Sequence, residues 1–402
     1  SRTCGILIES FPDSARVNLD HSYALEVRDL TRPEFQYARL LESRVEFAEA
    51  TFGKDHIARR SGRRNAFIWP SFVRIGPEAM NLVRAEEGTE IVSGLSSPKR
   101  YLWDEEPGNQ NWRFQNVGAN QTLPLIARSA FRFLNERGDV IRQIEEEERR
   151  KLQRKGRSSK DSAIRPRFAR SALFGFMLAE IVCHALVQIN DPGARASRAQ
   201  SSLPRRLRNI ILTLPSATPI QEQAIIRSRA EGALKLIWSI LDIRENTAVT
   251  CRRPNLIVEW DEATCTQFVY LFNEITRKFD GAIDGYLDLK GKPRSRPEAP
   301  GVKPERSLRV ACVDVGGGTT DLMITTFYAE MNRVLHPRQT FREGFRVAGD
   351  DLLREVISAL VLPRLRDSIE AAGGAYAQER LAALFGGNVG GQDEQARQLR
   401  RQ

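Results

Sequence analysis

The sequence predicts an α/β protein, and two observations support this fold class. Short apolar runs typical of buried strands alternate with longer segments whose apolar residues recur every three or four positions, as in helices. The chain has 402 residues, of which 41% are hydrophobic and 28% charged, a composition typical of globular proteins. This length predicts two or more lobes.

The order of the elements follows from these patterns. The predicted strands lie at residues 4–10, 23–30, 66–76, 207–215, 254–260, 310–328 (a hairpin) and, in part, 334–345. The predicted helices lie at residues 33–53, 171–189, 219–241, 261–279 and 350–365.

The composition excludes several classes of protein. No apolar run approaches the roughly 20 residues of a membrane span, and the start of the sequence lacks a signal-peptide pattern. The five cysteines are scattered, without the spacing of a zinc site or a disulfide framework. The four histidines do not cluster, and His184 is expected to be a packed side chain. We therefore expect a soluble, cytoplasmic protein with reduced and mostly buried thiols.

The net charge of +10 is concentrated in two segments. Residues 145–170 carry ten basic and five acidic side chains, and residues 288–309 carry seven basic and three acidic ones. Both are expected to be exposed, mobile insertions. A basic surface would attract nucleic acid or anionic lipid, but no aromatic side chains are interleaved for base stacking. Solvated loops are therefore the favoured interpretation.

The stretch "VACVDVGGGTTDLMITTFY", residues 310–328, is the most informative part of the sequence. Apolar residues before Asp314, including Val313, and after Asp321 predict two buried strands. Gly316, Gly317 and Gly318 between them predict a tight turn. Glycine permits positive φ and removes the Cβ, so that consecutive amide groups can surround an anion.

A nucleotide phosphate is the anion expected in this turn. Thr319 and Thr320 would offer hydroxyl groups to it. Asp314 and Asp321, at the two edges of the loop, predict Mg²⁺, which takes one or two carboxylates and keeps several waters. An ordinary glycine-rich hairpin is the alternative. The Walker A pattern is absent, which excludes a P-loop enzyme.

The hairpin resembles the second phosphate-binding motif of the actin, sugar-kinase and DnaK-type chaperone ATPase superfamily, where it reads Asp-Leu-Gly-Gly-Gly-Thr-Phe-Asp. Five further stretches resemble motifs of these ATPases in the same order, which makes the set far more specific than any one of them. They are "WPSFVRIG" (69–76), "SSPKRYLW" (96–103), "IILTLPSATPIQEQAIIRSRAEGA" (210–233), "DEATCTQF" (261–268) and "VAGDDLLREVI" (347–357). Within the superfamily, these blocks and the arginine-rich insertions look like the bacterial SrfB family of virulence factors.

This resemblance implies an actin-like fold with two lobes, each a mixed sheet flanked by helices, around a nucleotide cleft. Residues 1–143 would form part of the first lobe, followed by a basic linker (144–167) and the remainder of that lobe (168–282). A proline- and arginine-rich insertion (283–306) would precede the start of the second lobe (307–402).

The resemblance also implies roles for individual residues. Asp314 would hold hydrated Mg²⁺ or orient the attacking water, and Asp321 would anchor the hairpin. Gly316, Gly317 and Gly318 would cradle the β- and γ-phosphates, with Thr319 near the γ-phosphate and Thr320 beside it. Lys99 would face the γ-phosphate, Glu262 would reach the metal or water shell, and Gly349 would start a helix beside the site. The alternatives are a solvated lysine at position 99 and a helix-terminal charge at position 262.

Two pieces of the family pattern are missing. The first phosphate loop has no counterpart in residues 1–30, and "LFGGNVGGQ" (384–392) is interpreted as a surface loop rather than the adenosine motif. We expect the sequence to be a fragment that is incomplete at both ends. If it were the whole protein, the nucleotide site would be incomplete and hydrolysis doubtful.

Three functions remain open. The first is a bacterial, cytoplasmic switch that binds ATP and Mg²⁺, hydrolyses ATP slowly if at all, and acts on a protein partner. The second is a scaffold that retains the fold without hydrolysis, and the third is an actin-like filament former. A sugar kinase is disfavoured, because no substrate-pocket signature accompanies the phosphate motifs. No peptide-binding domain is visible, so the fold does not imply chaperone activity.

Overall fold

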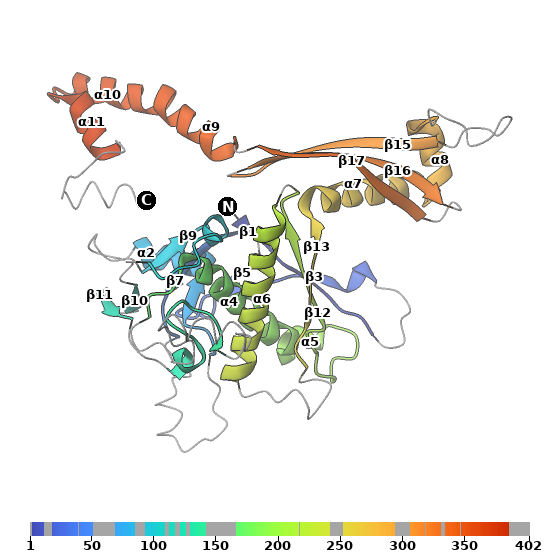
Figure 1. Ribbon diagram of the computed structural model, residues 1–402, viewed down its shortest axis with the longest axis horizontal. Coiled ribbons are helices and arrows are strands. Elements are labelled where there is room, and N and C mark those ends of the chain that lie inside the picture. The colour runs from blue at the N-terminus through green and yellow to red at the C-terminus, as the bar shows by residue number, and fades with distance from the viewer. Residues whose placement is uncertain are drawn as a thin grey trace, which may run out of the picture. The chain divides into compact units, whose positions relative to one another are not determined.

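The chain is a mixed α/β protein whose contacts divide it into two compact units (Figure 1). The first unit contains Ser1–Ile210, Ala224–Leu256 and Gln378–Gln402, and the second contains Ile211–Gln223 and Ile257–Ala377. The computed structural model describes residues 2–11, 18–38, 40–50, 69–84, 93–108, 112–116, 121–125, 129–141, 166–216, 218–241, 252–293, 306–317, 319–330, 334–345 and 347–385.

The strands of the first unit form small antiparallel sheets. The largest has the order β8-β7-β9, with β7 at its centre. The strands are β1 (Arg2–Thr3), β2 (Ile6–Ile8), β3 (Ser22–Ala24), β4 (Val27–Arg28), β5 (Gln36–Tyr37), β6 (Leu41–Glu42), β7 (Arg44–Phe47), β8 (Val73–Ile75), β9 (Gly94–Ser96), β10 (Arg113–Asn116) and β11 (Gln121–Pro124).

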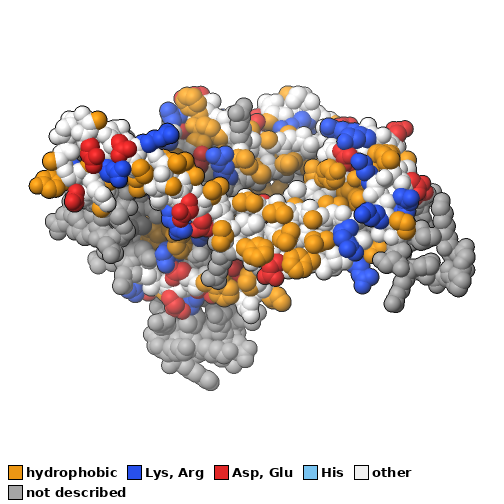
Figure 2. Space-filling model, turned by 90° about the horizontal axis from the view of Figure 1, so that it is seen from above, with side chains coloured by type: hydrophobic (Ala, Val, Ile, Leu, Met, Phe, Trp, Pro, Cys, Tyr) orange, Lys and Arg blue, Asp and Glu red, His pale blue; other side chains and the backbone are white. Residues whose placement is uncertain are grey.

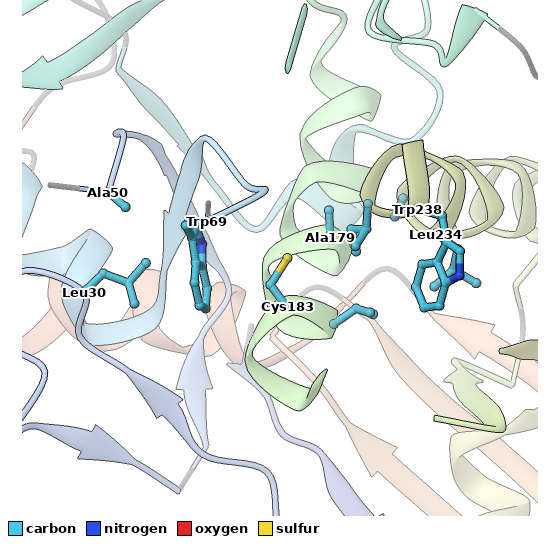
Figure 3. Packing of buried hydrophobic residues seen from close by; sticks show 10 residues of the cluster. Leu30, Ala50, Trp69, Ala179, Cys183, Leu234 and Trp238 are labelled. Carbon is cyan, nitrogen blue, oxygen red and sulfur yellow. The ribbon is translucent and has the colours of Figure 1, made fainter. Parts of the chain in front are cut away.

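Two long helices form the core of the first unit. They are α4 (Arg170–Asn190) and α6 (Ile220–Ile240). The first residues of α6 belong to the second unit. The shorter helices are α2 (Gly76–Arg84), α5 (Pro192–Ala196) and α11 (Ala377–Phe385). One buried cluster joins Ala179 and Cys183 of α4 to Leu234 and Trp238 of α6 (Figure 3). Trp69, from the predicted "WPSFVRIG" strand, packs into the same cluster.

The apolar composition of α4 has a structural explanation. By length and composition alone this helix is able to cross a membrane, which corrects the sequence expectation that no apolar run approaches that length. However, 78% of its most apolar window is buried inside the protein. It passes close to α6, because a Cβ placed on Gly175 would lie 3.1 Å from the carbonyl oxygen of Arg229. His184 is buried as predicted, and its Nδ1 accepts a hydrogen bond from the amide of Arg28.

The second unit is built on a four-stranded antiparallel sheet of order β14-β15-β16-β17. Helices α7 and α8 pack against it, and their buried residues Leu271, Ile275, Tyr286 and Leu287 form a core with Phe327 of β16. The elements are β12 (Asn209–Leu214), β13 (Asn255–Asp261), α7 (Glu262–Lys278), α8 (Ile283–Lys290), β14 (Lys292–Pro293), β15 (Arg306–Val315), β16 (Thr320–Glu330), β17 (Val334–Phe345), α9 (Gly349–Val356), a π-helical segment (Ile357–Val361) and α10 (Leu362–Ala371).

Among the described residues, helices cover one face of this sheet and leave apolar side chains of the other face exposed, which corrects one sequence expectation. Val310 and Cys312 point to the face that carries Phe327 and the helices, whereas Val313 points to the opposite face and is 62% exposed. The prediction that Val313 is buried was therefore wrong. Strand periodicity alone does not reveal whether one or both faces of a sheet are covered.

Most predicted helices and strands occur where the sequence placed them, with one clear exception. Residues 33–53 were expected to form a helix, but the described part contains β5, β6 and β7. Val45 and Phe47 pair with β8, and Val45 also pairs with β9, so that pairing between distant segments overrides the local pattern. Residues 145–165 of the first basic segment lie outside the described residues, whereas residues 283–293 of the predicted insertion form α8 and β14.

Candidate functional site

The glycine turn between β15 and β16 is the centre of the candidate site. The two strands pair continuously from Ser307↔Tyr328 to Val315↔Thr320, and the amide of Gly316 donates a 2.9 Å hydrogen bond to the carbonyl oxygen of Thr319. A Cβ on Gly316 would lie 3.0 Å from that same oxygen. A larger residue would therefore force the turn apart.

The start of α9 is bound to this turn. The amide of Gly349 donates a 2.9 Å hydrogen bond to the carbonyl oxygen of Gly316, and Thr320 Oγ1 donates a 2.6 Å bond to the carbonyl oxygen of Val347. A Cβ on Gly349 would lie 3.1 Å from the oxygen of Gly316. The structure thus places the start of α9 next to the hairpin turn, with Gly349 bonded to Gly316 and Val347 bonded to Thr320.

Two carboxylates occupy one side of the hairpin next to the turn. Asp314 and Asp321 are directly opposite each other in the ladder, on the face of the sheet that also carries Cys312 and Met323. Asp321 is buried and Asp314 is half-buried. Like charges placed directly opposite each other in a sheet are unfavourable, so this position suits a bound cation.

A third segment reaches the same face through the N-terminus of α7. Asp261 caps this helix, with Oδ1 accepting hydrogen bonds from the Thr264 amide (2.8 Å) and from Ser216 Oγ (2.9 Å). Thr264 Oγ1 donates to Asp261 Oδ2 at 2.6 Å and contacts the sulfur of Met323 at 3.7 Å. Asp261 therefore links the "LPSAT" loop, the "DEAT" helix start and the hairpin.

The acidic side chains of these segments act on two nearby thiols. Burial raises the pKa of the Cys312 thiol, and the charges of Asp314 and Asp261 raise it further. Burial also raises the pKa of Cys265, with a further contribution from Asp261 and Glu262. The negative charges at the start of α7 and at the end of β15 thus act on one face of the sheet.

The remaining predicted residues are less concentrated. Glu262 is the first residue of α7 and is half-buried, and Thr319 is exposed in the turn beside the half-buried Gly317. Gly318 lies outside the described residues. Lys99 lies on the 3₁₀ helix Pro98–Tyr101, which belongs to the first unit, whereas the other residues predicted for the site belong to the second.

Three residues with a part in this arrangement were missed by the sequence reasoning: Ser216, Asp261 and Thr264. The sequence did contain a signal for the last two, because an aspartate three residues before a threonine at the start of an apolar helical pattern is a capping signature. Ser216 carries no such signal, since its bond to Asp261 spans 45 residues.

Within the described ranges, no group of three or more histidine, cysteine, aspartate or glutamate side chains is arranged to hold a metal ion. A glycine turn beside a helix N-terminus suits an anion, and Mg²⁺ bound to phosphates needs only one or two carboxylates.

Comparison with known proteins gives one clear result. No curated protein matches the chain. The family model described as virulence factor SrfB matches residues 1–402, which is the whole of the sequence. The chain therefore belongs to the SrfB virulence factor family.

Proposed function

We propose that the protein binds ATP with Mg²⁺ at the β15–β16 glycine turn and acts as a nucleotide-dependent conformational switch of the actin and DnaK type. This goes further than the family membership, which identifies a virulence factor. The observation that supports it most directly is the hydrogen bond between the Gly349 amide and the Gly316 carbonyl, which joins the start of α9 to the turn.

The turn and the helix start offer complementary features to a phosphate group. Glycines allow a phosphate to approach the backbone closely, and the helix dipole places partial positive charge at its N-terminus. A phosphate at Gly316 and Gly317 would lie beside the exposed hydroxyl of Thr319. Thr320 is bonded to the carbonyl oxygen of Val347, which fits a role in holding the turn.

A nucleotide site also needs a metal ion, and the carboxylates would provide for it. In this proposal Asp314 holds Mg²⁺ through water, while the buried Asp321 fixes the hairpin. Glu262 and Asp314 would orient the attacking water. Lys99, carried by the first unit, would approach the γ-phosphate when the lobes close and stabilise the charge that develops during transfer.

Such a site would act chiefly by moving lobes rather than by fast turnover. Closure around the nucleotide would change the surface offered to a protein partner in the bacterial cytoplasm. Hydrolysis, if it occurs, would be an in-line attack of water on the γ-phosphate.

Calorimetric titration of the intact protein with Mg²⁺-ATP tests the proposal. We expect binding by the unmodified protein and at least a tenfold loss of affinity in Asp314→Ala, because the metal loses its carboxylate anchor. Asp284→Ala serves as the control, since it removes the same kind of side chain from an exposed position of α8. Its affinity should match that of the unmodified protein.

Two other results would change the conclusion. Absence of Mg²⁺-ATP binding by the unmodified protein would refute the nucleotide switch and leave the fold as an interaction scaffold. Tight binding without turnover, unaffected by Lys99→Ala, would also favour a scaffold that does not hydrolyse ATP. Light scattering that rises with nucleotide and protein concentration would instead indicate a filament former.

A further inference from the structure

One face of the β15–β17 sheet carries apolar side chains that nothing in the described part of the chain covers. Helices α7 and α8 pack on the opposite face. On the open face, Val313 and Val315 are each 62% exposed, and Phe341 and Phe345 are 43% and 47% exposed. Figure 2 shows hydrophobic side chains gathered over these strands. Contiguous apolar patches of this kind mark interaction sites.

The helical segment that follows the sheet has an exposed apolar stripe of its own. Leu353, Ile357 and Leu360 are 57%, 38% and 56% exposed, although they recur at the three- and four-residue spacing that normally faces a core. The stripe continues through the π-helical segment into α10. Sheet face and helix stripe are therefore both without an apolar partner in this structure.

The helix is held in a position from which it does not cover its own sheet. Its first residue, Gly349, is bonded to Gly316, and the preceding Val347 is bonded to Thr320. From this attachment at the end of the hairpin, α9 and α10 extend away from the strands (Figure 1). The sheet and the helical segment therefore follow one another end to end within the second unit (Figure 1), so that the helix leaves its own sheet face open to a second copy.

The two surfaces also match in length. The 23 residues from Gly349 to Ala371 span about 34 Å at 1.5 Å per residue. The 11 residues of β16 span about 37 Å at 3.4 Å per residue. A helix laid along the sheet from the turn outward would place Ile357 over the row of Phe341, since both are about 12 Å from the turn.

We propose that this sheet face binds the α9–α10 helix of a second copy of the chain, and that the exchange is reciprocal about a two-fold axis. Each copy then contributes one sheet face and one helix, as in domain-swapped dimers. A helix about 34 Å long and about 10 Å wide gives roughly 1,400 Å² over the four surfaces, within the standard size of specific interfaces.

Molar mass from light scattering, measured across a range of protein concentrations, is the first test. The intact protein should be a dimer, and Ile357→Glu and Phe341→Glu should each weaken dimerisation at least 100-fold. Glu355→Lys is the matched control, because Glu355 lies on the opposite side of α9 from Ile357, and it should leave the dimer unchanged. A monomer at every concentration would overturn the proposal.

Exchange between copies is tested separately by disulfide formation. One preparation carries Ile357→Cys alone and the other Phe341→Cys alone, each compared with the parent protein to account for native cysteines. A disulfide should form only after the two are mixed and allowed to exchange subunits. If the disulfide forms only when both cysteines are in one chain, and does so in a monomer, then each helix covers its own sheet and the second copy is excluded.

Discussion

At the scale of single residues, the first unit contains a buried charged cluster whose members titrate in opposite directions. The Glu180 carboxylate pairs with Arg74 and accepts a 2.9 Å hydrogen bond from Trp69 Nε1, and His184 lies 3.2 Å from it. Burial would raise the pKa of Glu180, but Arg74 and His184 outweigh that effect and hold it at about 2. Arg74 therefore has one fully ionised partner.

Glu78 is the second carboxylate near Arg74, and it behaves differently. It is 3% exposed, and its Oε2 accepts a 3.1 Å hydrogen bond from the Leu30 amide. Burial raises its pKa to about 7, although Arg74 and the Leu30 amide lower it, while Glu180 and Asp29 add to the increase. At neutral pH the folded protein therefore binds a proton here that the unfolded chain has released.

This difference predicts how stability depends on pH. Because the pKa of Glu78 is raised in the folded protein, the contribution of Glu78 to the free energy of unfolding is fully present below about pH 4.5. This contribution is lost as the pH rises through about 7. Glu78→Gln keeps the acceptor for Leu30 and removes the titration. At pH 8 we expect this variant to be more stable than the unmodified protein by roughly 1–3 kcal/mol, measured by urea unfolding.

The comparison at low pH supplies the control for this prediction. At pH 5 the stabilising difference should nearly disappear, because Glu78 is then protonated in the unmodified protein. Glu180→Gln should be destabilising instead, since the lowered pKa of Glu180 contributes stability above about pH 4.5 that is lost as the pH falls toward 2. A pH-independent effect of Glu78→Gln would contradict the raised pKa.

At the scale of elements, the sequence predicted those whose pattern is strong and local. α4, α6 and α7 were expected because their apolar residues recur with helical spacing over 17–21 residues. The glycine turn and the start of α9 were expected from the resemblance. The helix predicted at residues 33–53 was wrong, because that segment takes its structure from pairing with β8 and β9, which lie 26 or more residues away. The local sequence pattern of a segment does not reveal which distant strand it will pair with.

The same reasoning separates the predicted from the unpredicted parts of the site. Asp314, Asp321 and Gly316 were identified because they lie in one short motif. Ser216 was missed because only the fold brings it to Asp261. The exposure of Val313 was missed because coverage of a sheet face depends on which helices pack on it, which in turn depends on the chain connections.

Gly94 in β9 offers a test of the small sheet around β7. A Cβ at this position would overlap the carbonyl oxygen of Val45 and the carboxylate of Glu46. We expect Gly94→Ala to destabilise the protein by about 3 kcal/mol, as overpacking of a rigid backbone does, measured by chemical denaturation. Gly285→Ala is the control, because its Cβ would make only ordinary van der Waals contacts, with Phe279 and Ala282. Equal stabilities of the two variants would contradict the strand pairing.

At the scale of the whole molecule, the two units have separate cores. The first is centred on α4 and α6, and the second on α7, α8 and β16. Each has residues that are almost entirely buried, such as Ile237 at 1% exposure and Phe327 at 0%. Independent cores allow independent unfolding steps.

Differential scanning calorimetry tests this independence. Ile237→Ala should lower the midpoint of one unfolding transition and Phe327→Ala that of another, because each removes about 2–5 kcal/mol of core packing from a different unit. A single transition that both variants shift equally would show that the units unfold as one.

The burial of α4 by α6 has a consequence for how the protein is made. The ribosome completes α4 at residue 190 and reaches the end of α6 only at residue 240. At roughly 5–20 residues per second this interval lasts about 3–10 s. Throughout it, the nascent chain carries an apolar helix of membrane-spanning length whose covering helix does not yet exist. Translation speed between these two helices therefore determines how long cellular factors that recognise apolar segments can compete with folding.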